Sequence, residues 1–437
     1  MMAVSSVFGL SASIQSPSYV DRNGLDAGLQ NALEAKRHVV VHGSSKQGKT
    51  WLRSRILNED ASIIVQCVPG SSIESILTQA LGKIGVTAVL KKVRAAEVSG
   101  TLNFEAAGDL GAKILAKLGV KIGAGLAGKK SDSTEVAPVG QKPADLLWVA
   151  TAIQESGRRL IVEDFHYLDE PTQKEFAFVI KALGEYGLFF VIVGVWPTEH
   201  LLTYYNGDLD GRVENFQLSW TDDELHAVLS SGSPALGIEF ADDLAASIVA
   251  DSFGNVGLLQ RLVERLCLDE GVDDLTWESK PRKIELGSSL SVARDHVASQ
   301  MNGRYQAFAD NFVRGMRRMP TGLEVYLMLL RAVTEADNRE LIEGIDSLEL
   351  LRRLNGMPGG NDIRQSDLTQ ALERVDRLQV KIAVRPPVLT YNKSSRKLFL
   401  ADRSFLFYRQ HANPRWPWMD DANLSNDLAD QDPLLVD

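Results

Sequence analysis

The sequence predicts an α/β protein: a parallel sheet covered by helices, then a helical lid domain and a C-terminal winged helix. Runs of almost continuous apolar residues at 37–43, 62–67 and 188–196 alternate with helical patterns. Strands of this kind are buried on both faces, as in a parallel sheet between two layers of helices. Close to the C-terminus, three helical patterns are followed by two alternating strands around a turn at 392–395, which is the element order of a winged helix.

Length and composition indicate a globular protein. The chain has 437 residues, which at about 150 residues per domain predicts two to four domains. Hydrophobic residues make up 44% of it, and only two cysteines, Cys67 and Cys267, are present, which fits a reducing compartment. The N-terminus lacks a signal-peptide pattern, and the longest apolar run is Leu188 to Trp196, far short of a membrane span. We therefore expect a cytoplasmic protein without a membrane span.

The charge is unevenly distributed. The formal net charge is -10, but residues 301–411 carry 18 Lys and Arg against 13 Asp and Glu, a net +5. The tail at 412–437 carries one Arg against six Asp, a net -5. This distribution argues against nucleic-acid binding along the whole chain, but the basic C-terminal module alone could still bind nucleic acid.

These patterns divide the chain into four parts. We expect a nucleotide-binding core at 1–220, a helical lid at 221–300, a winged helix-turn-helix at 301–411 and an acidic tail at 412–437. The core contains a Gly- and Lys-rich insertion at about 82–142. This insertion is predicted to be a hairpin or loop, with a membrane-active or partner-binding amphipathic helix as the alternative, because glycine disfavours helix.

The segment GSSKQGKT carries the strongest functional signal. It matches G-x-x-x-x-G-K-[ST] between a predicted strand and a predicted helix. Its glycines let backbone N–H groups point into one concavity, Lys49 is expected to reach the β- and γ-phosphates of ATP, and the Thr50 hydroxyl to bind Mg²⁺. The residues predicted to contact the nucleotide are Gly43, Ser44, Ser45, Lys46, Gln47, Gly48, Lys49, Thr50 and Trp51.

An acidic pair, Glu163 and Asp164, ends the apolar run at 160–162. Parallel strands deliver such side chains to the same sheet edge as the phosphate loop. One carboxylate is expected to hold Mg²⁺ and the other to polarise the attacking water, and either assignment is open. His166 follows the pair and is expected to be structural, because no further His or Cys spacing suggests a metal site.

The order of these segments resembles the AAA+ P-loop ATPases of the Orc1/Cdc6-like and STAND-like branch. The resemblance rests on the box YVDR at 19–22, the phosphate loop, VEDFHYL at 162–168, FVIVGVW at 190–196, the helical lid and the winged helix. It implies that Val20 and Arg22 lie by the adenine and that Arg212 is an arginine finger. Two departures are a sensor strand ending in GVW and a lid sequence GNVG without the usual Arg or Pro, for which Arg261 is a candidate substitute.

The predicted winged helix carries basic residues on its recognition helix and wing. These are Arg364, Gln365, Arg374, Arg377, Lys393, Arg396 and Lys397. Side chains of this kind contact DNA phosphates without reading sequence, but winged helices also dock proteins. Trp416 and Trp418 are expected to anchor the acidic tail to the rest of the protein.

The expected function is that of an Mg²⁺-dependent ATPase acting as a molecular switch. Nucleotide state is expected to control homo-oligomerisation or engagement of DNA or a protein partner, as in a STAND-like switch of a bacterial defence system. The alternatives are an Orc1/Cdc6-like or transposition-type DNA-binding ATPase and a nucleotide-binding scaffold with little turnover. No effector segment is recognisable, so the output is expected from a partner protein.

Overall fold

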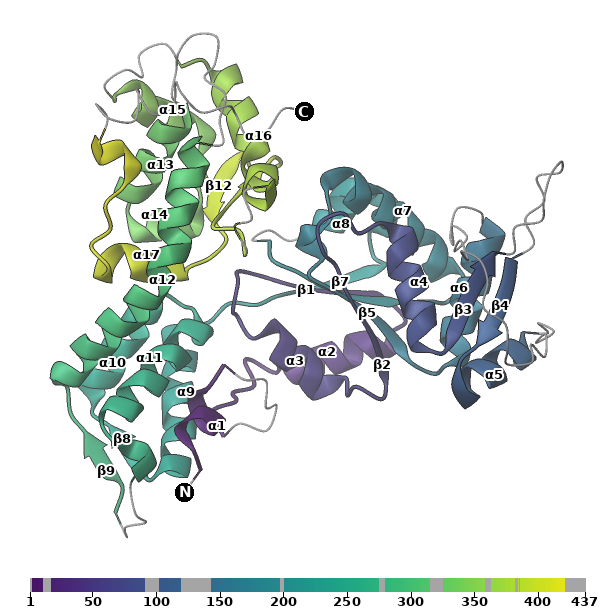
Figure 1. Ribbon diagram of the computed structural model, residues 1–437, viewed down its shortest axis with the longest axis horizontal. Helices are drawn as coiled ribbons and strands as arrows, with labels where there is room; N and C mark the ends of the chain where they lie inside the picture. The colour runs from purple at the N-terminus through teal and green to yellow at the C-terminus, as the bar shows by residue number, and fades with distance from the viewer. Residues whose placement is uncertain are drawn as a thin grey trace, which may run out of the picture.

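The computed structural model describes most of the chain (Figure 1). The described residues are 2–10, 17–90, 102–118, 143–196, 200–274, 280–314, 325–357, 363–381, 384 and 386–420. Most of the insertion predicted at 82–142 and the acidic tail beyond residue 420 therefore lie outside the described part. No described helix is both long enough and apolar enough to cross a membrane.

A five-stranded parallel sheet forms the centre of the core, as the sequence predicts. Its strand order is β2-β5-β6-β1-β7. The strands are β1 (His38–His42), β2 (Ser62–Gln66), β5 (Arg159–Glu163), β6 (Phe190–Val193) and β7 (Val213–Gln217). β1 lies between β6 and β7: after β1 the chain crosses to the edge strand β2, returns through β5 and β6, and adds β7 on the other side of β1. The loop after β1 consequently opens at a point of reversed strand order, where α/β sheets bind ligands.

Helices cover both faces of this sheet (Figure 1). Val39 and Val41 point to one face and Val40 to the other, as successive strand residues must. The first face is covered by α2 (Leu25–Glu34) and α3 (Lys49–Ile56), and the second by α4 (Ile73–Lys83), α6 (Pro143–Glu155), α7 (Glu170–Glu185) and α8 (Leu201–Tyr205). This layering confirms the predicted fold class.

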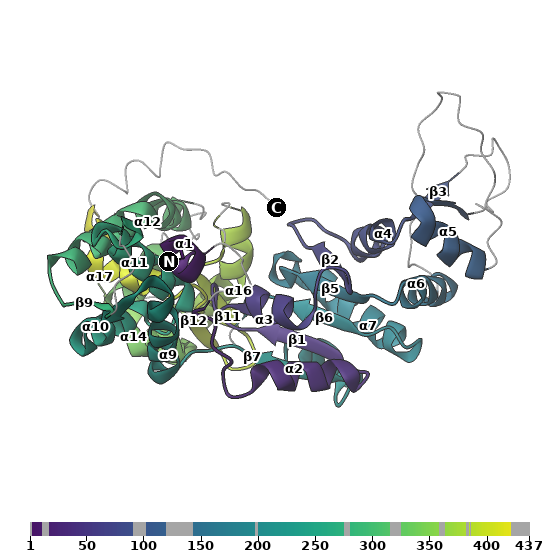
Figure 2. The same ribbon diagram turned by 90° about the horizontal axis from the view of Figure 1, so that it is seen from below.

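The described part of the insertion contains a hairpin and a helix. An antiparallel hairpin of β3 (Val86–Leu90) and β4 (Leu102–Ala106) is followed by α5 (Gly108–Lys117). Ile114 and Leu115 of α5 are buried in the same apolar cluster as the sheet, so this helix packs on its own domain. Figure 2 shows the hairpin and α5 at the end of the core far from the lid and C-terminal domain.

The lid is a helical bundle with a small parallel strand pair. It consists of α9 (Asp222–Gly232), α10 (Asp242–Ser252), α11 (Val256–Asp269), β8 (Ile238–Phe240) and β9 (Arg282–Ile284). Thr221 caps α9 in a capping box with Glu224, as its sequence indicates. The N-terminal helix α1 (Val4–Phe8) packs into the same apolar cluster as α11, so the start of the chain belongs to the lid.

The C-terminal domain has the element order predicted for a winged helix, and its assignment to that class stays a prediction. Its elements are α12 (Ser288–Arg314), α13 (Val325–Glu335), α14 (Asn338–Glu343), β10 (Ile345–Asp346), α15 (Ser347–Asn355), α16 (Gln365–Lys381), β11 (Leu389–Asn392), β12 (Lys397–Leu400) and α17 (Ser404–His411). The boundary expected between residues 300 and 301 lies within α12. Trp416 is buried, and the Trp418 indole donates to Thr334, so both hold the chain to the domain before residue 420.

Short 3-10 helices connect these elements, at Phe165–Tyr167, Gly207–Leu209, Ser233–Leu236, Val272–Asp274 and Pro417–Asp420.

Candidate nucleotide-binding site

The phosphate loop turns between β1 and α3 at the carboxyl edge of the sheet. Gly43 has a φ of 136°, and a Cβ there would lie 2.4 Å from the Leu218 carbonyl oxygen of the neighbouring strand end. Gly48 has a φ of 79° and caps the start of α3. Both positions therefore require glycine, the first for close backbone approach and the second for a left-handed conformation.

Lys49 is buried in this loop. Its Nζ donates to the carbonyl oxygens of Ser44, at 2.5 Å, and Gly43, at 3.2 Å. Burial lowers the pKa of Lys49 to about 7, and the nearby Asp164 carboxylate opposes this shift. A phosphate group would offer a counter-charge, and the site is therefore built to receive an anion.

The two acidic residues that end β5 have different environments. Both Nε and Nη2 of Arg53, on α3, donate to the Glu163 carboxylate, at 3.1 and 2.8 Å, and both side chains are at least nine-tenths buried. Asp164 is half-buried, in a left-handed conformation with a φ of 57°. Burial and the neighbouring Glu163 raise the pKa of Asp164, whereas Lys49 lowers it. Asp164 thus faces the loop lysine, while Glu163 is already paired.

Two histidines lie near the carboxyl ends of strands: His42 ends β1, and His166 follows β5. The backbone N–H of Val195, just after β6, donates to Nδ1 of His166 at 3.3 Å, which places the proton of the neutral ring on Nε2. Burial lowers the pKa of His166 to about 3, so the ring is neutral. His42, at the end of β1, stacks on Trp196 with ring centroids 5.5 Å apart. His166 thus holds the strand end in place, in agreement with its predicted structural role.

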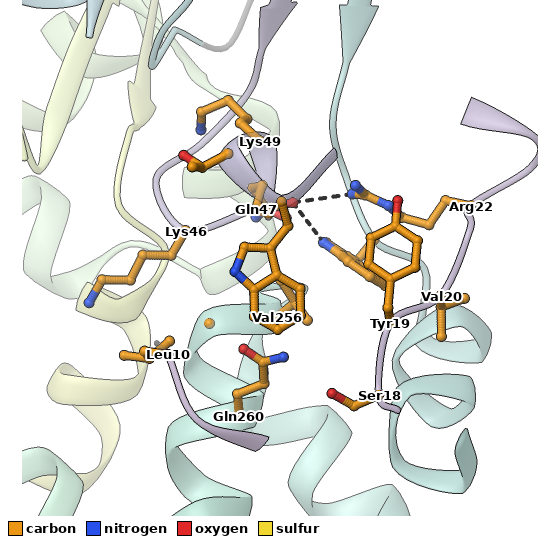
Figure 3. A pocket seen from close by; sticks show the side chains of 15 residues that line it. Leu10, Ser18, Tyr19, Val20, Arg22, Lys46, Gln47, Lys49, Val256 and Gln260 are labelled. Carbon is orange, nitrogen blue, oxygen red and sulfur yellow. Dashed lines mark hydrogen bonds between the residues drawn. The ribbon is translucent and has the colours of Figure 1, made fainter. Parts of the chain in front are cut away.

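A cavity of about 320 Å³ opens from the phosphate loop toward the lid (Figure 3). It is lined by Leu10, Ser18, Tyr19, Val20, Arg22, Lys46, Gln47, Gly48, Lys49, Thr50, Trp51, Trp220, Val256, Gly257 and Gln260. Three of these side chains are cationic, Arg22, Lys46 and Lys49, and most of the others are apolar or aromatic. One end of the cavity can therefore hold phosphates and the other a flat ring.

Comparison with solved structures was made on this architecture. A Walker-type ATPase of Pyrococcus abyssi superposes with a TM-score of 0.53 and 14% identity, over 93% of this chain and 99% of that one. The chain has the α/β P-loop fold of that Walker-type ATPase.

Two further structures resemble the chain with lower scores. The Orc1 protein of Aeropyrum pernix in complex with DNA gives a TM-score of 0.40 at 10% identity, covering 95% of this chain and 96% of that one. The RuvB Holliday junction branch migration motor of Thermotoga maritima gives 0.35 at 15% identity, covering 91% and 96%. No protein-family model and no curated protein sequence matches the chain.

The AAA+ core is bonded to the lid through its phosphate loop. Gln47 Nε2 donates to the Gly254 carbonyl at 2.9 Å, and the Gly257 N–H donates to the Lys46 carbonyl at 3.2 Å. The buried Asn255 side chain donates to the Ser45 carbonyl at 3.3 Å. Residues 254–257, the lid segment that lacks the usual Arg or Pro, thus bind the loop through the backbones of Ser45 and Lys46 and the side chain of Gln47.

The C-terminal domain also contacts the phosphate loop. The Ser45 N–H donates to the carbonyl of Ala401 at 3.0 Å, and Asn255 contacts Ser404 at 3.4 Å. The neighbouring Asp402 is fully buried and accepts from Arg304 at 2.6 Å and from Tyr305 at 2.8 Å. Core, lid and C-terminal domain therefore meet at residues 45–47.

Several predicted site residues do not line the cavity. Gly43, Ser44 and Ser45 form the loop behind it, and Glu163 and Asp164 lie at the neighbouring strand end. Arg212 precedes β7, at the edge of the sheet opposite the phosphate loop, where its half-exposed side chain lies 3.5 Å from Glu185. Arg261 donates to Gln300 of α12 rather than lining the cavity, so it does not replace the missing lid arginine in this conformation.

Part of the basic surface of the C-terminal domain faces the AAA+ core. Lys393, in the turn between β11 and β12, lies 3.1 Å from Glu170 of α7 and 3.6 Å from Glu373 of α16. Lys397 donates to the carbonyl of Glu343 within its own domain. Of the basic residues predicted to contact DNA, Lys393 is therefore committed to an inter-domain ion pair here.

The sequence analysis did not predict several residues of this site, among them Trp220, Arg53 and Gln260. Trp220 stacks under Arg22, whose guanidinium carbon lies 4.1 Å from the ring centroid, and its indole donates to the Gln47 carbonyl at 3.1 Å. Arg53 neutralises Glu163, and Gln260 lines the cavity from α11. Arg53 lies one turn into the helix after the loop, and this position could have indicated its pairing with Glu163. No local sequence pattern indicates Trp220 or Gln260.

Proposed function

We propose that the protein is an ATP-binding and ATP-hydrolysing molecular switch, in which nucleotide controls how the lid and C-terminal domain lie on the AAA+ core. The fold is that of P-loop ATPases, and the cavity has a cationic end and an apolar end. Arg22, Lys46 and Lys49 supply three positive charges for a triphosphate. The Gly-rich loop, in which Gly43 leaves no room for a Cβ, would bind the phosphates through its backbone N–H groups.

The chain supplies residues for each step of phosphoryl transfer to water. Lys49 would neutralise the β- and γ-phosphates, while the Thr50 hydroxyl and the Asp164 carboxylate would hold Mg²⁺, which polarises the phosphoryl group when bound. Asp164 would also orient the attacking water, because Glu163 is engaged by Arg53. Arg212 lies too far from its own phosphate loop to act there and would serve a neighbouring subunit, as proposed for an arginine finger.

The bonding of the phosphate loop carries the switch proposal. The backbones of Ser45 and Lys46 and the side chain of Gln47 are hydrogen-bonded to the lid, and the Ser45 backbone also to Ala401 of the C-terminal domain. A loop that reshapes around phosphate must strain or break these bonds, so nucleotide binding and domain position are coupled. The output would be ATP-dependent self-association or release of a protein partner.

DNA engagement is a second candidate, supported by the net charge of +5 on residues 301–411. The ion pair of Lys393 with Glu170 places part of this basic surface against the core. DNA binding would then require the C-terminal domain to move away from α7, and it would be coupled to the same nucleotide switch. A scaffold that binds ATP with little turnover remains the alternative to both.

The switch can be tested by distance measurement between spin labels. Cys67 and Cys267 are buried, so labels go to cysteines introduced at the exposed Phe178 of α7 and Arg339 of α14. We expect the distance distribution to shift by at least about 5 Å between ADP and a non-hydrolysable ATP analogue, as in hinge closure. A control pair at Phe178 and Tyr204, both in the core, should not shift. Identical distributions in both states, with normal ATP turnover, would contradict the switch and leave the ATPase.

A further inference from the structure

Gln260 of α11 combines burial with an unused hydrogen-bonding group. Its side chain is 6% exposed and lines the cavity, yet its carboxamide makes no hydrogen bond with any residue that the structure describes. A carboxamide that lines a cavity and has no protein partner can form hydrogen bonds only with water or with a ligand in that cavity. Such a group inside a binding cavity is typically satisfied by the ligand.

The position of Gln260 is that of a base contact rather than a phosphate contact. In Figure 3 its carboxamide points into the cavity from the helix, with Leu10 on one side and Tyr19 on the other, and Lys49 lies at the opposite end. The walls near it include Val20 and Val256, which are apolar. A flat aromatic ring between such walls, with phosphates directed to Lys49, would present its polar edge to Gln260.

The chemistry of the carboxamide selects the edge that it can bind. It offers one acceptor oxygen beside N–H donors, and the 6-amino group of adenine beside N1 or N7 offers a donor next to an acceptor. Two parallel hydrogen bonds follow. Guanine also has a complementary edge at N1–H and O6. Gln260 therefore accounts for contact with the 6-amino group of adenine but not for discrimination against guanine.

We infer that Gln260 is the residue that recognises the adenine edge, through paired hydrogen bonds to the 6-amino group and an adjacent ring nitrogen. This inference rests on the proposed ATP binding and identifies the base-recognition residue of the same site. It also separates two roles within the lid: residues 254–257 bind the phosphate loop, and Gln260, one turn further along α11, binds the base.

The test compares ATP with purine riboside triphosphate, which lacks only the 6-amino group. Dissociation constants are measured by calorimetry for the wild type, Gln260→Met, Gln260→Leu and the control Gln30→Leu, which alters an exposed glutamine outside the cavity. Wild type and control should bind ATP about tenfold more tightly than the analogue. Gln260→Met and Gln260→Leu should bind both within about threefold of each other, mainly through weaker ATP binding.

The stability of the nucleotide-free protein provides an independent measurement. Gln260→Met removes an amide without a protein partner at nearly constant volume, so its midpoint in urea should stay close to that of the wild type. A loss of ATP and analogue affinity by the same factor, or a lower midpoint, would show a packing role and overturn the inference. Failure of the wild type to bind either nucleotide would contradict the proposed function as well, which distinguishes the two failures.

Discussion

The pairing of Arg53 with Glu163 predicts that the two acidic residues after β5 respond differently to mutation. The side chains of Arg53 and Glu163 are only 6% and 10% exposed, and the shortest distance between their nitrogen and oxygen atoms is 2.8 Å. Removing one partner from such a pair leaves an uncompensated buried charge, which costs about 3 to 5 kcal/mol. Glu163→Gln keeps an oxygen acceptor for the guanidinium, so we expect about 3 kcal/mol, the lower end of that range.

The assay for this prediction is urea unfolding followed by tryptophan fluorescence. With an m-value of about 3 kcal/mol/M for a core of this size, the Glu163→Gln midpoint should fall by about 1 M. The double variant Arg53→Met/Glu163→Gln removes both charges and should recover most of the loss, because neither charge is then left buried without its partner. Asp164→Asn, whose side chain is half-buried, should unfold near the wild-type midpoint but hydrolyse ATP about 100-fold more slowly with ATP affinity retained.

One result would refute this reasoning. If Glu163→Gln unfolds at the wild-type urea concentration and lowers turnover as strongly as Asp164→Asn, then the ion pair is not structural. Glu163 would instead act directly in hydrolysis.

Four further predictions concern the other charged residues. Lys49→Ala should abolish high-affinity ATP binding by calorimetry, and a Kd within about threefold of wild type would disprove the phosphate-loop assignment. Burial holds the pKa of Lys49 at about 7, and phosphates would restore its charge, so ATP binding at pH 8 should take up close to one proton. The proton uptake is measured from the buffer dependence of the binding enthalpy, and Lys49→Arg should not show it. Arg212→Ala should lower turnover without changing ATP affinity, and it should regain activity when mixed with Asp164→Asn. If the wild type is a monomer and its turnover per subunit stays constant over a hundredfold dilution, Arg212 does not act as an arginine finger on a neighbouring subunit. Lys393→Glu should weaken DNA binding, and Glu170→Gln should strengthen it by releasing Lys393 from the core; equal affinities for both variants in a salt titration would exclude this surface as the DNA contact.

The sequence was sufficient where function depends on local pattern. Apolar β-branched runs predicted β1, β2 and β5, and the spacing of Gly43, Gly48 and Lys49 located the loop, because phosphate binding needs these residues within a single turn. The acidic pair was placed at the correct strand end for the same reason. The break between α10 and α11 at residues 254 and 255 was also readable from glycine.

The parts that could not be predicted depend on contacts between distant segments. Arg53 and Glu163 are 110 residues apart, and Asn255 reaches Ser45 across 210 residues. Composition and periodicity carry no information about such pairs, since each partner alone is an ordinary polar residue. The roles of Glu163 and Asp164 stayed open in the sequence for this reason, and the contact between Ser45 and Ala401 left no trace in it.

The 27-residue helix α12 has a mechanical consequence for this protein. It begins in the lid, where Leu290 and Ala293 are buried beside α11, and ends in the C-terminal domain, where Phe308 and Phe312 form part of that core. At 1.5 Å per residue it is a rod about 40 Å long, so a tilt of about 10° at the lid end moves the other end by about 7 Å. A sub-ångström adjustment around the phosphates could thus be amplified into a displacement wide enough to separate Lys393 from Glu170.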